Sequence, residues 1–553
     1  MQKLQVLIFC RVRIGPNLID PILYFLRNNP PTFALMKSMK PMILWADDEI
    51  ELLKPHVLFL EQKGYDVTTV NNGREAVSLV KERSFDLVFL DENMPGISGL
   101  QALQEIKALN ADIPVVMITK SEEEHIMEDA IGSKIADYLI KPVNPNQILL
   151  SIKKNLDDKR LIQEKTTQDY RQEFREISMQ LGQSMNADEW KEFMKKLVYW
   201  TTELSQTSEE SMKEILQTQK IEANQQFVKF YEQRYLDWIN AKTEAPVMSH
   251  TLFNKKIKSL VQPGQPLYWV VIDNLRYDQW KVIAPFLKDL FRTEEEDIYY
   301  SILPTATMYA RNAMFSGLLP TEMQKLHSQW WKEEDEEGSK NEHEHDFLQA
   351  QLKRLGMNVK TSYHKVVQNQ FGKKLVDQIS NLKQNDLNVI VYNFVDMLSH
   401  ARSEMEVIKE LAEDTPAYLS LTKSWFEHSP LREMLEKMAE QKARVIITTD
   451  HGTVRVEDPI KIVGDKATNN NLRYKVGKNL NYNAKDVFEV KDPAAAHLPR
   501  PQLSSSYVFA KSKGYFVYPN NYNHFVTHFR NTFQHGGISL EEVLIPFVVL
   551  QAK

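Results

Sequence analysis

The chain has 553 residues, 42% of them hydrophobic, which is enough for about three or four domains with cores of their own. Its formal net charge of −6 excludes a general electrostatic attraction to nucleic acid, so an anionic ligand must be held by local cations. The single cysteine, Cys10, excludes an intrachain disulfide and fits a reducing, cytoplasmic compartment. No run approaches ~20 apolar residues, so membrane insertion is not expected.

Residues 1–37 do not share the pattern of the rest of the chain. Arg11 and Arg13 interrupt the apolar stretch around Cys10, and no small-residue cleavage site comes after it. We therefore expect residues 1–37 to be a non-native or disordered extension, with the physiological start at Met36 rather than Met39. A genuine N-terminal anchor is the alternative.

Residues 38–157 alternate short strand-like runs with amphipathic helical stretches. The runs MILWA, DVTTV, DLVFL, VVMIT and DYLI predict a doubly wound parallel sheet, an α/β fold. Ligands of such sheets bind beyond the carboxyl ends of the strands. Clustered carboxylates at those ends favour Mg2+, and a lysine favours a phosphoryl group. The polar residues placed there are Asp47, Asp48, Asp91, Thr119 and Lys141.

The motifs DD, LDENMPG, MITK and YLIKP, in this order and at this spacing, resemble the receiver domain of two-component response regulators. The resemblance implies that a sensor histidine kinase phosphorylates Asp91 and that phosphorylation drives homodimerisation. It further implies a switch pair, Thr119 and Tyr138, and a phosphate contact, Lys141. The implied Mg2+ ligands are Asp47, Asp48, Asp91 and the backbone carbonyl of Asn93.

Residues 158–250 predict an all-α helical bundle, because good helix formers dominate them. Residues 146–245 contain no proline and a single glycine, Gly182, and apolar residues recur at helical spacing. Asn186 or Asp188 would cap one of the helices. The bundle either couples the receiver to the C-terminal domain or serves as a spacer.

Residues 251–553 return to alternating strands and helices and predict a second α/β domain. The runs LYWVVID, VIVYNFVD, ARVIITTD and VLIPFVVL are nearly continuously apolar, as buried strands are. Three of these runs end in an aspartate, and histidines lie in the same region. Together they supply the ligand types of a two-metal hydrolase. The candidates are Asp273, Asp396, His400, Asp450, His451 and His535.

A candidate nucleophile lies in the segment LPTATMYARNAMFSG. Thr307 would stand near a helix N-terminus, where free N–H groups favour a phosphate. A threonine hydroxyl needs a metal or a base to react at neutral pH. Simple helix capping by Thr305 and Thr307 is the structural alternative.

The charge-dense segment 332–346 is expected to be an exposed insertion. Its two histidines, His343 and His345, are not expected to bind metal.

The motifs IDNLRYD, PTATMYAR, DMLSH, TDHG and HGGISLEEV resemble, in this order, the alkaline phosphatase superfamily and specifically its PglZ branch. The resemblance implies two Zn2+ ions and selects Thr307 over Thr305 as the nucleophile. Arg311, one helical turn further on, would bind a non-bridging phosphoryl oxygen, with Arg276 and Arg455 as competing candidates. One ion would be held by Asp396, His400 and His535, and the other by Asp273, Asp450, His451 and Thr307.

The combination of receiver, bundle and PglZ-like domain resembles the PorX type of response regulator, which is tied to type IX secretion. It implies a cytoplasmic protein in which phosphorylation at Asp91 controls a two-zinc phosphodiesterase that acts on cyclic or linear oligonucleotides. Implied partners are the kinase, a component of the secretion motor and a sigma factor. The alternative function is a phosphorylation-controlled docking protein with a vestigial metal site.

Overall fold

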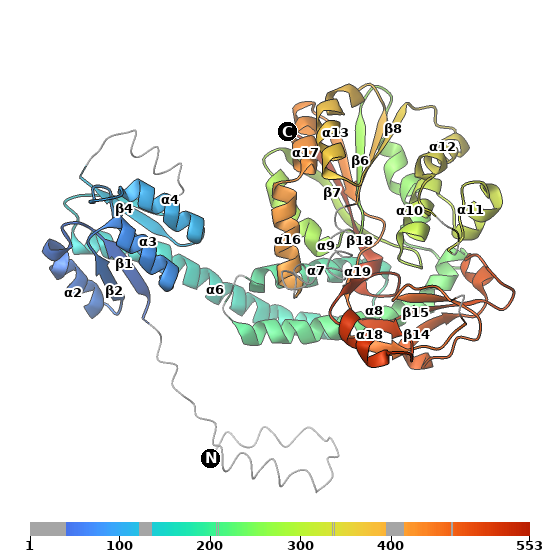
Figure 1. Cartoon of the computed structure of the whole chain (residues 1–553), viewed down its shortest axis with the longest axis horizontal. Helices are drawn as coiled ribbons and strands as arrows, with labels where there is room; N and C mark the ends of the chain where they lie inside the picture. The colour runs from blue at the N-terminus through green and yellow to red at the C-terminus, as the bar shows by residue number, and fades with distance from the viewer. Residues whose placement is uncertain are drawn as a thin grey trace, which may run out of the picture. The chain divides into compact units, whose positions relative to one another are not determined.

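The structure is a computed structural model that describes residues 40–120, 135–393 and 414–553. Single positions are excepted within these ranges: Gln206, Ser208, Asp335, Glu337, Lys466, Ala467 and the side chains of residues 157–165. The chain divides into two compact units, Met1–Lys165 and Thr166–Lys553 (Figure 1). Among the described helices, none combines the length and the apolar character that crossing a bilayer requires.

The first unit contains the predicted parallel sheet, with strand order β2-β1-β3-β4-β5. Apolar side chains from alternate positions of the strands form two separate layers, one on each face of the sheet. Helices of this unit pack against these layers (Figure 1). The elements are β1 Met42–Ala46, α2 Lys54–Gln62, β2 Asp66–Val70, α3 Gly73–Glu82, β3 Leu87–Asp91, α4 Gly99–Leu109, β4 Val115–Thr119 and β5 Asp137–Ile140.

A glycine fixes the position of α4 beside the end of β3. Ser98 caps α4, its hydroxyl accepting the Gln101 N–H while the Gln101 side chain accepts the Ser98 N–H. A Cβ atom at Gly99 would lie 2.3 Å from the backbone oxygen of Asp91. Only glycine therefore allows α4 to start this close to the strand that carries Asp91.

Three long helices come next, as the bundle prediction expected: α6 Pro145–Leu181, α7 Ala187–Ser205 and α8 Glu210–Ile239. The helix α7 buries the aromatic stripe that includes Trp190, Phe193 and Trp200. Asn186, rather than Asp188, is its cap: the Asn186 side chain accepts the N–H groups of Asp188 and Glu189 at 2.9 and 3.0 Å.

The second α/β part is built on a six-stranded sheet with order β7-β18-β10-β6-β9-β8. The strands β8, β9, β6 and β10 run parallel, β18 is antiparallel to β10, and β7 is antiparallel to β18. The strand β7 therefore points the same way as β10. The bounds are β6 Leu267–Ile272, β7 Phe291–Tyr300, β8 Thr361–Val366, β9 Leu387–Tyr392, β10 Arg444–Thr448 and β18 Leu544–Ala552.

Helices lie on both faces of this sheet, with α13 and α17 on one side and α10 and α12 on the other (Figure 1). The predicted α/β class is confirmed for both parts. The larger helices are α9 Tyr277–Ile283, α10 Thr307–Ser316, α11 Pro320–Leu326, α12 Glu344–Arg354, α13 Asn369–Leu382, α16 Thr415–Glu427 and α17 Pro430–Glu440.

Small sheets and two short helices complete the C-terminal region. They are β11 Val454–Arg455, β12 Asp458–Lys461, β13 Tyr474–Gly477, β14 Val487–Val490, β15 Ser506–Ala510, β16 Gly514–Val517, α18 Tyr522–Phe529, β17 Phe533–Gln534 and α19 Leu540–Val543.

Candidate functional site

The receiver site lies at the carboxyl ends of β1, β3 and β5. Asp47 and Asp91 are buried, and the Lys141 ammonium lies 2.9 Å from Asp47 Oδ2 and 2.9 Å from Asp91 Oδ1. Asp47, Asp48 and Asp91 each have a carboxylate oxygen that lies within 4.8 Å of those of the other two. Burial raises the pKa of Asp91 to about 6, against the opposing effect of Lys141, because a charged carboxylate is poorly solvated there. The oxygen donors fit a hard divalent cation such as Mg2+.

The other receiver candidates surround this cluster. Thr119 ends β4 and is fully buried, while Tyr138 lies on β5. Burial raises the pKa of the Tyr138 phenol, and a side-chain hydrogen bond with Thr119 counteracts part of that rise. Asn93 is exposed two residues after Asp91. The two residues predicted as a switch pair are therefore already in contact.

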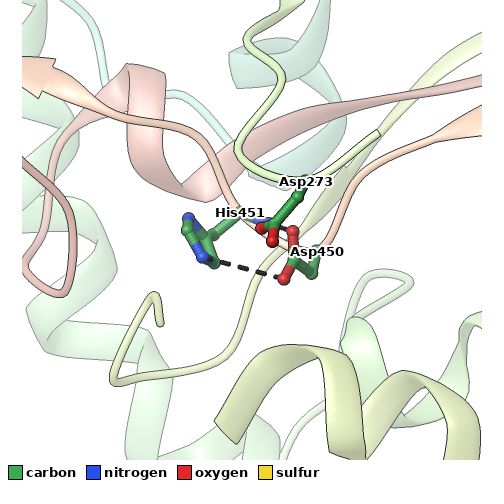
Figure 2. A group of neighbouring side chains, drawn as sticks. All are labelled: Asp273, Asp450 and His451. Carbon is green, nitrogen blue, oxygen red and sulfur yellow. Dashed lines mark hydrogen bonds and ion pairs between the residues drawn. The ribbon is translucent and has the colours of Figure 1, made fainter. Parts of the chain in front are cut away.

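The hydrolase candidates meet at one edge of the larger sheet. Asp273 directly follows β6, and Asp450 and His451 follow the neighbouring parallel strand β10. All three are buried, and their ligand atoms lie within 4.8 Å of one another. Figure 2 shows the three side chains turned toward a common space, with His451 Nε2 3.7 Å from Asp450 Oδ2. Two oxygen donors and one imidazole fit Zn2+.

Thr307 begins α10, and the segment after β7 brings it to the same edge. Its hydroxyl lies 3.0 Å from His451 Nε2 and 3.5 Å from Asp273 Oδ1. The Thr305 hydroxyl has backbone partners instead. It is buried, donates to the Gly537 carbonyl at 2.8 Å and accepts the Gly536 N–H at 3.0 Å. Of the two hydroxyl groups, the Thr307 hydroxyl is thus the one that contacts candidate metal ligands.

His535 follows β17 and stacks on His451, with ring centroids 4.3 Å apart. Each of the two rings contacts a backbone carbonyl through Nδ1: His535 that of Thr305 and His451 that of Gly452, both at 3.1 Å. A carbonyl only accepts hydrogen bonds, so Nδ1 carries the proton in both rings. Nε2 is then the nitrogen with the lone pair in both, as a metal ligand requires.

Arg311 is buried and contacts acidic side chains of the site. Its guanidinium lies 2.7 Å from Asp273 Oδ2, 2.5 Å from Glu344 Oε1 and 3.7 Å from Asp450 Oδ2. Burial disfavours its charge, but these carboxylates together raise its pKa. A phosphoryl oxygen would have to compete with them for Arg311.

The two competing arginines also have acidic partners. Arg276 donates to Asp278 Oδ1 at 2.8 Å, and Arg455 lies 3.2 Å from Glu457 Oε1.

Two residues next to the site were not foreseen from the sequence. Glu344 is fully buried against Arg311, and the Asn341 side chain donates to the Thr307 carbonyl at 3.0 Å. Both belong to segment 332–346, so the expectation of a wholly exposed insertion was wrong at this end. A charged residue and a polar residue in a charge-dense segment predict an exposed surface. Their partners, Arg311 and Thr307, are distant in sequence and could not be inferred from it. His343 and His345 belong to neither of the two groups of candidate metal ligands found among the described residues.

Two predicted ligands, Asp396 and His400, fall in residues 394–413, outside the part of the chain that the structure describes.

A glycine allows the segment after His451 to lie close to the helix α19. A Cβ atom at Gly452 would lie 1.9 Å from the backbone oxygen of Glu541, in the segment that follows His535. We predict that Gly452→Ala pushes these two segments apart, lowers bound zinc and any hydrolysis at least tenfold, and costs about 1–3 kcal/mol of stability as other overpacked sites do. Zinc content and thermal unfolding measure both effects. Gly182→Ala is the control, since its nearest contact is 3.4 Å; equal behaviour of the two variants would contradict the prediction.

Comparison with known proteins divides the chain in the same way. Residues 43–153 match the response regulator receiver domain, residues 160–239 the PorX response regulator linker domain, and residues 252–550 the BREX system PglZ alkaline phosphatase-like domain.

Several similar proteins each match about a fifth of this chain. The transcriptional regulatory protein ZraR of Escherichia coli K12 is 37% identical over 114 residues, 21% of this chain and 26% of that protein. ResD of Bacillus subtilis is 32% identical over 20% of this chain and 46% of its own length. This chain therefore covers only between about a quarter and a half of these relatives. The response regulator protein TrrA of Thermotoga maritima, solved in complex with Mg(2+)-BeF, is 30% identical, with 21% of this chain and 99% of that chain covered and a TM-score of 0.21.

The fold and the two sites define a response regulator whose receiver is joined to an alkaline phosphatase-like domain. The PglZ match covers more than half of the residues, and the chain belongs to this family, in the arrangement of a PorX-type response regulator.

Proposed function

We propose that the chain is a response regulator in which phosphorylation of Asp91 controls a two-zinc phosphodiesterase that acts on cyclic or linear oligonucleotides. The observation that carries the proposal is the position of the Thr307 hydroxyl, 3.0 Å from His451 Nε2 and 3.5 Å from Asp273 Oδ1 in a buried cluster of metal-ligand types. A plain helix cap would not need a buried cluster of two aspartates and a histidine around it.

Each implied ion has its own set of ligands. Asp273, Asp450 and His451 would hold one zinc beside Thr307, and His535 would hold the other together with Asp396 and His400. Zinc, when bound, supplies positive charge that lowers the pKa of a hydroxyl and stabilises phosphoryl oxygens.

The residues of the chain then carry out the substitution. Thr307 Oγ gives up its proton to solvent and attacks phosphorus, and the ester bond to one alcohol breaks as that oxygen takes up a proton from solvent. The phosphate stays on Thr307 with its remaining ester substituent, as a nucleotidyl-threonine. Water releases it in a second step. The N-terminus of α10 faces the developing negative charge. Arg311 orients Asp273 through their 2.7 Å contact.

The linker helix α8 supports a role in coupling rather than in spacing. Its Tyr231 hydroxyl donates to the Ser301 carbonyl at 2.8 Å, in the segment that leads to Thr307. Its Asn224 side chain accepts the Leu540 N–H at 3.2 Å, in the segment that follows His535. A displacement of α8 would therefore act on both segments of the site directly.

Regulation and partners follow from the domain arrangement. A receiver implies a histidine kinase partner. We further propose homodimerisation on phosphorylation, a role in type IX secretion through a motor component or a sigma factor, and a cytoplasmic location. The competing proposal, a docking protein with a vestigial site, predicts the same partners but no turnover.

Hydrolysis of bis(p-nitrophenyl) phosphate by the full chain separates these proposals. We expect turnover in the purified protein, loss of it after chelation, and recovery on addition of Zn2+. Absence of turnover at full zinc occupancy would support docking instead.

We also predict a preference for diesters over monoesters. A monoester carries two negative charges and gains from extra cationic contacts, but Arg311 and Arg276 are engaged by Asp273 and Asp278. The rate on bis(p-nitrophenyl) phosphate should exceed that on p-nitrophenyl phosphate severalfold under equal zinc. A several-fold faster reaction of the monoester would reverse this assignment.

A further inference from the structure

A cavity of about 570 Å³ lies next to the first turn of α10, the helix that Thr307 begins. It is lined by Met308, the residue after Thr307, and by Lys340, the neighbour of Asn341, whose side chain donates to the Thr307 carbonyl. A diester attacked at Thr307 has a substituent on each side of the phosphorus. The volume lies in the range typical of small-molecule sites, so one substituent can be accommodated here.

The wall of the cavity is fixed by polar contacts. Glu334 accepts the Tyr309 hydroxyl at 2.7 Å and the Asn469 side chain at 2.7 Å. The Lys475 ammonium donates to the Asn469 carbonyl at 2.8 Å and lies 4.7 Å from the centre of the Tyr518 ring. These partly buried contacts hold one wall rigid, which favours selective binding because little ordering is needed.

Two further amide side chains on the cavity, Asn470 and Gln502, are exposed. Neither makes a side-chain hydrogen bond to another described residue. Each offers a donor and an acceptor side by side, the pattern that pairs with the edge of a nucleobase. The charges around the cavity are mixed, because Lys340, Lys478, Glu334 and Asp465 all line it. Hydrogen bonding, rather than net charge, therefore decides what binds.

We infer that this cavity holds the nucleobase next to the scissile phosphate, with Asn470 and Gln502 reading its edge. The inference rests on the proposed phosphodiesterase function and adds to it the residues that select the substrate.

The test compares two substrates in the full, zinc-loaded chain. In the double variant Asn470→Ala/Gln502→Ala, kcat/KM for a linear dinucleotide should fall about tenfold, the effect of losing roughly one net hydrogen bond. The rate on bis(p-nitrophenyl) phosphate, which has no base, should stay unchanged. Asn520→Ala is the matched control, because Asn520 is an exposed amide outside the cavity.

A binding measurement provides a second readout that does not depend on turnover. Calorimetry with adenosine monophosphate on the Thr307→Ala chain should show about tenfold weaker binding when both amides are also removed.

Equal loss on both substrates, or unchanged dinucleotide hydrolysis and nucleotide binding, would overturn the inference. Hydrolysis of the synthetic diester but not of the dinucleotide by the wild type would overturn it too. Failure on both substrates, with nucleotide binding still dependent on the amides, would instead overturn the proposed function alone.

Discussion

Thr307→Ala should abolish hydrolysis of phosphodiesters while leaving most of the bound zinc in place. Removing the attacking atom leaves no route to the covalent intermediate, so we expect a loss of roughly 10³-fold or more in kcat. The other ligands, Asp273, Asp450 and His451, are buried and held by the ends of β6 and β10, and one hydroxyl contributes little to metal affinity. Turnover of bis(p-nitrophenyl) phosphate and zinc content, measured on the same preparation, test the loss of hydrolysis and the retention of zinc.

Two controls separate this role from helix capping. Thr307→Ser keeps a hydroxyl at the same place and should retain measurable turnover. Thr305→Ala removes the hydroxyl that bonds Gly536 and Gly537, so it should lower stability by about 1 kcal/mol or more and disturb His535. Undiminished turnover in Thr307→Ala would remove Thr307 as the nucleophile.

Beryllofluoride with Mg2+, a stable analogue of the phosphoryl group, should convert the wild-type chain from monomer to dimer. The analogue would form an ion pair with the Lys141 ammonium, which now bridges Asp47 and Asp91. It would also offer a new hydrogen-bond acceptor to the Thr119 hydroxyl. Tyr138, which contacts Thr119, would then move inward and reshape the adjoining face of the receiver. A shift from mostly monomer to mostly dimer requires only a few kcal/mol of differential binding.

Light scattering measures this change as a twofold rise in mass. Asp91→Ala should not respond, whereas Asp66→Ala, an exposed carboxylate at the start of β2, should respond as the wild type does. A wild-type chain that stays monomeric with the analogue bound would show that the receiver signals within one chain.

In the larger sheet, strand prediction succeeded where burial alone decides the residue types. The strands β6, β9, β10 and β18 are almost entirely buried, so their apolar runs stand out in the sequence. The edge strands β7 and β8 were missed. The first contains the run Thr293–Asp297 with four acidic residues, and the second is only partly buried, so neither has the apolar pattern of a strand.

The site was predicted in part for a similar reason. Asp273, Asp450 and His451 follow buried strands directly, so their convergence could be inferred from parallel strands alone. The ion pair between Arg311 and Glu344 could not be predicted from the sequence. It joins α10 to α12 through packing between helices, which no local sequence pattern indicates. Thr307 was chosen by family resemblance, and the hydroxyl contacts of Thr305 supply an independent reason for that choice.

The central claim is that this edge of the sheet is a two-zinc hydrolase site beside Thr307. The most direct test is a crystal of the zinc-loaded chain measured at the zinc absorption edge. We predict two anomalous peaks ~4 Å apart, as in two-metal hydrolases, one of them in contact with Asp273, Asp450, His451 and the Thr307 hydroxyl. A fully zinc-loaded crystal with no peak at these residues would contradict the account.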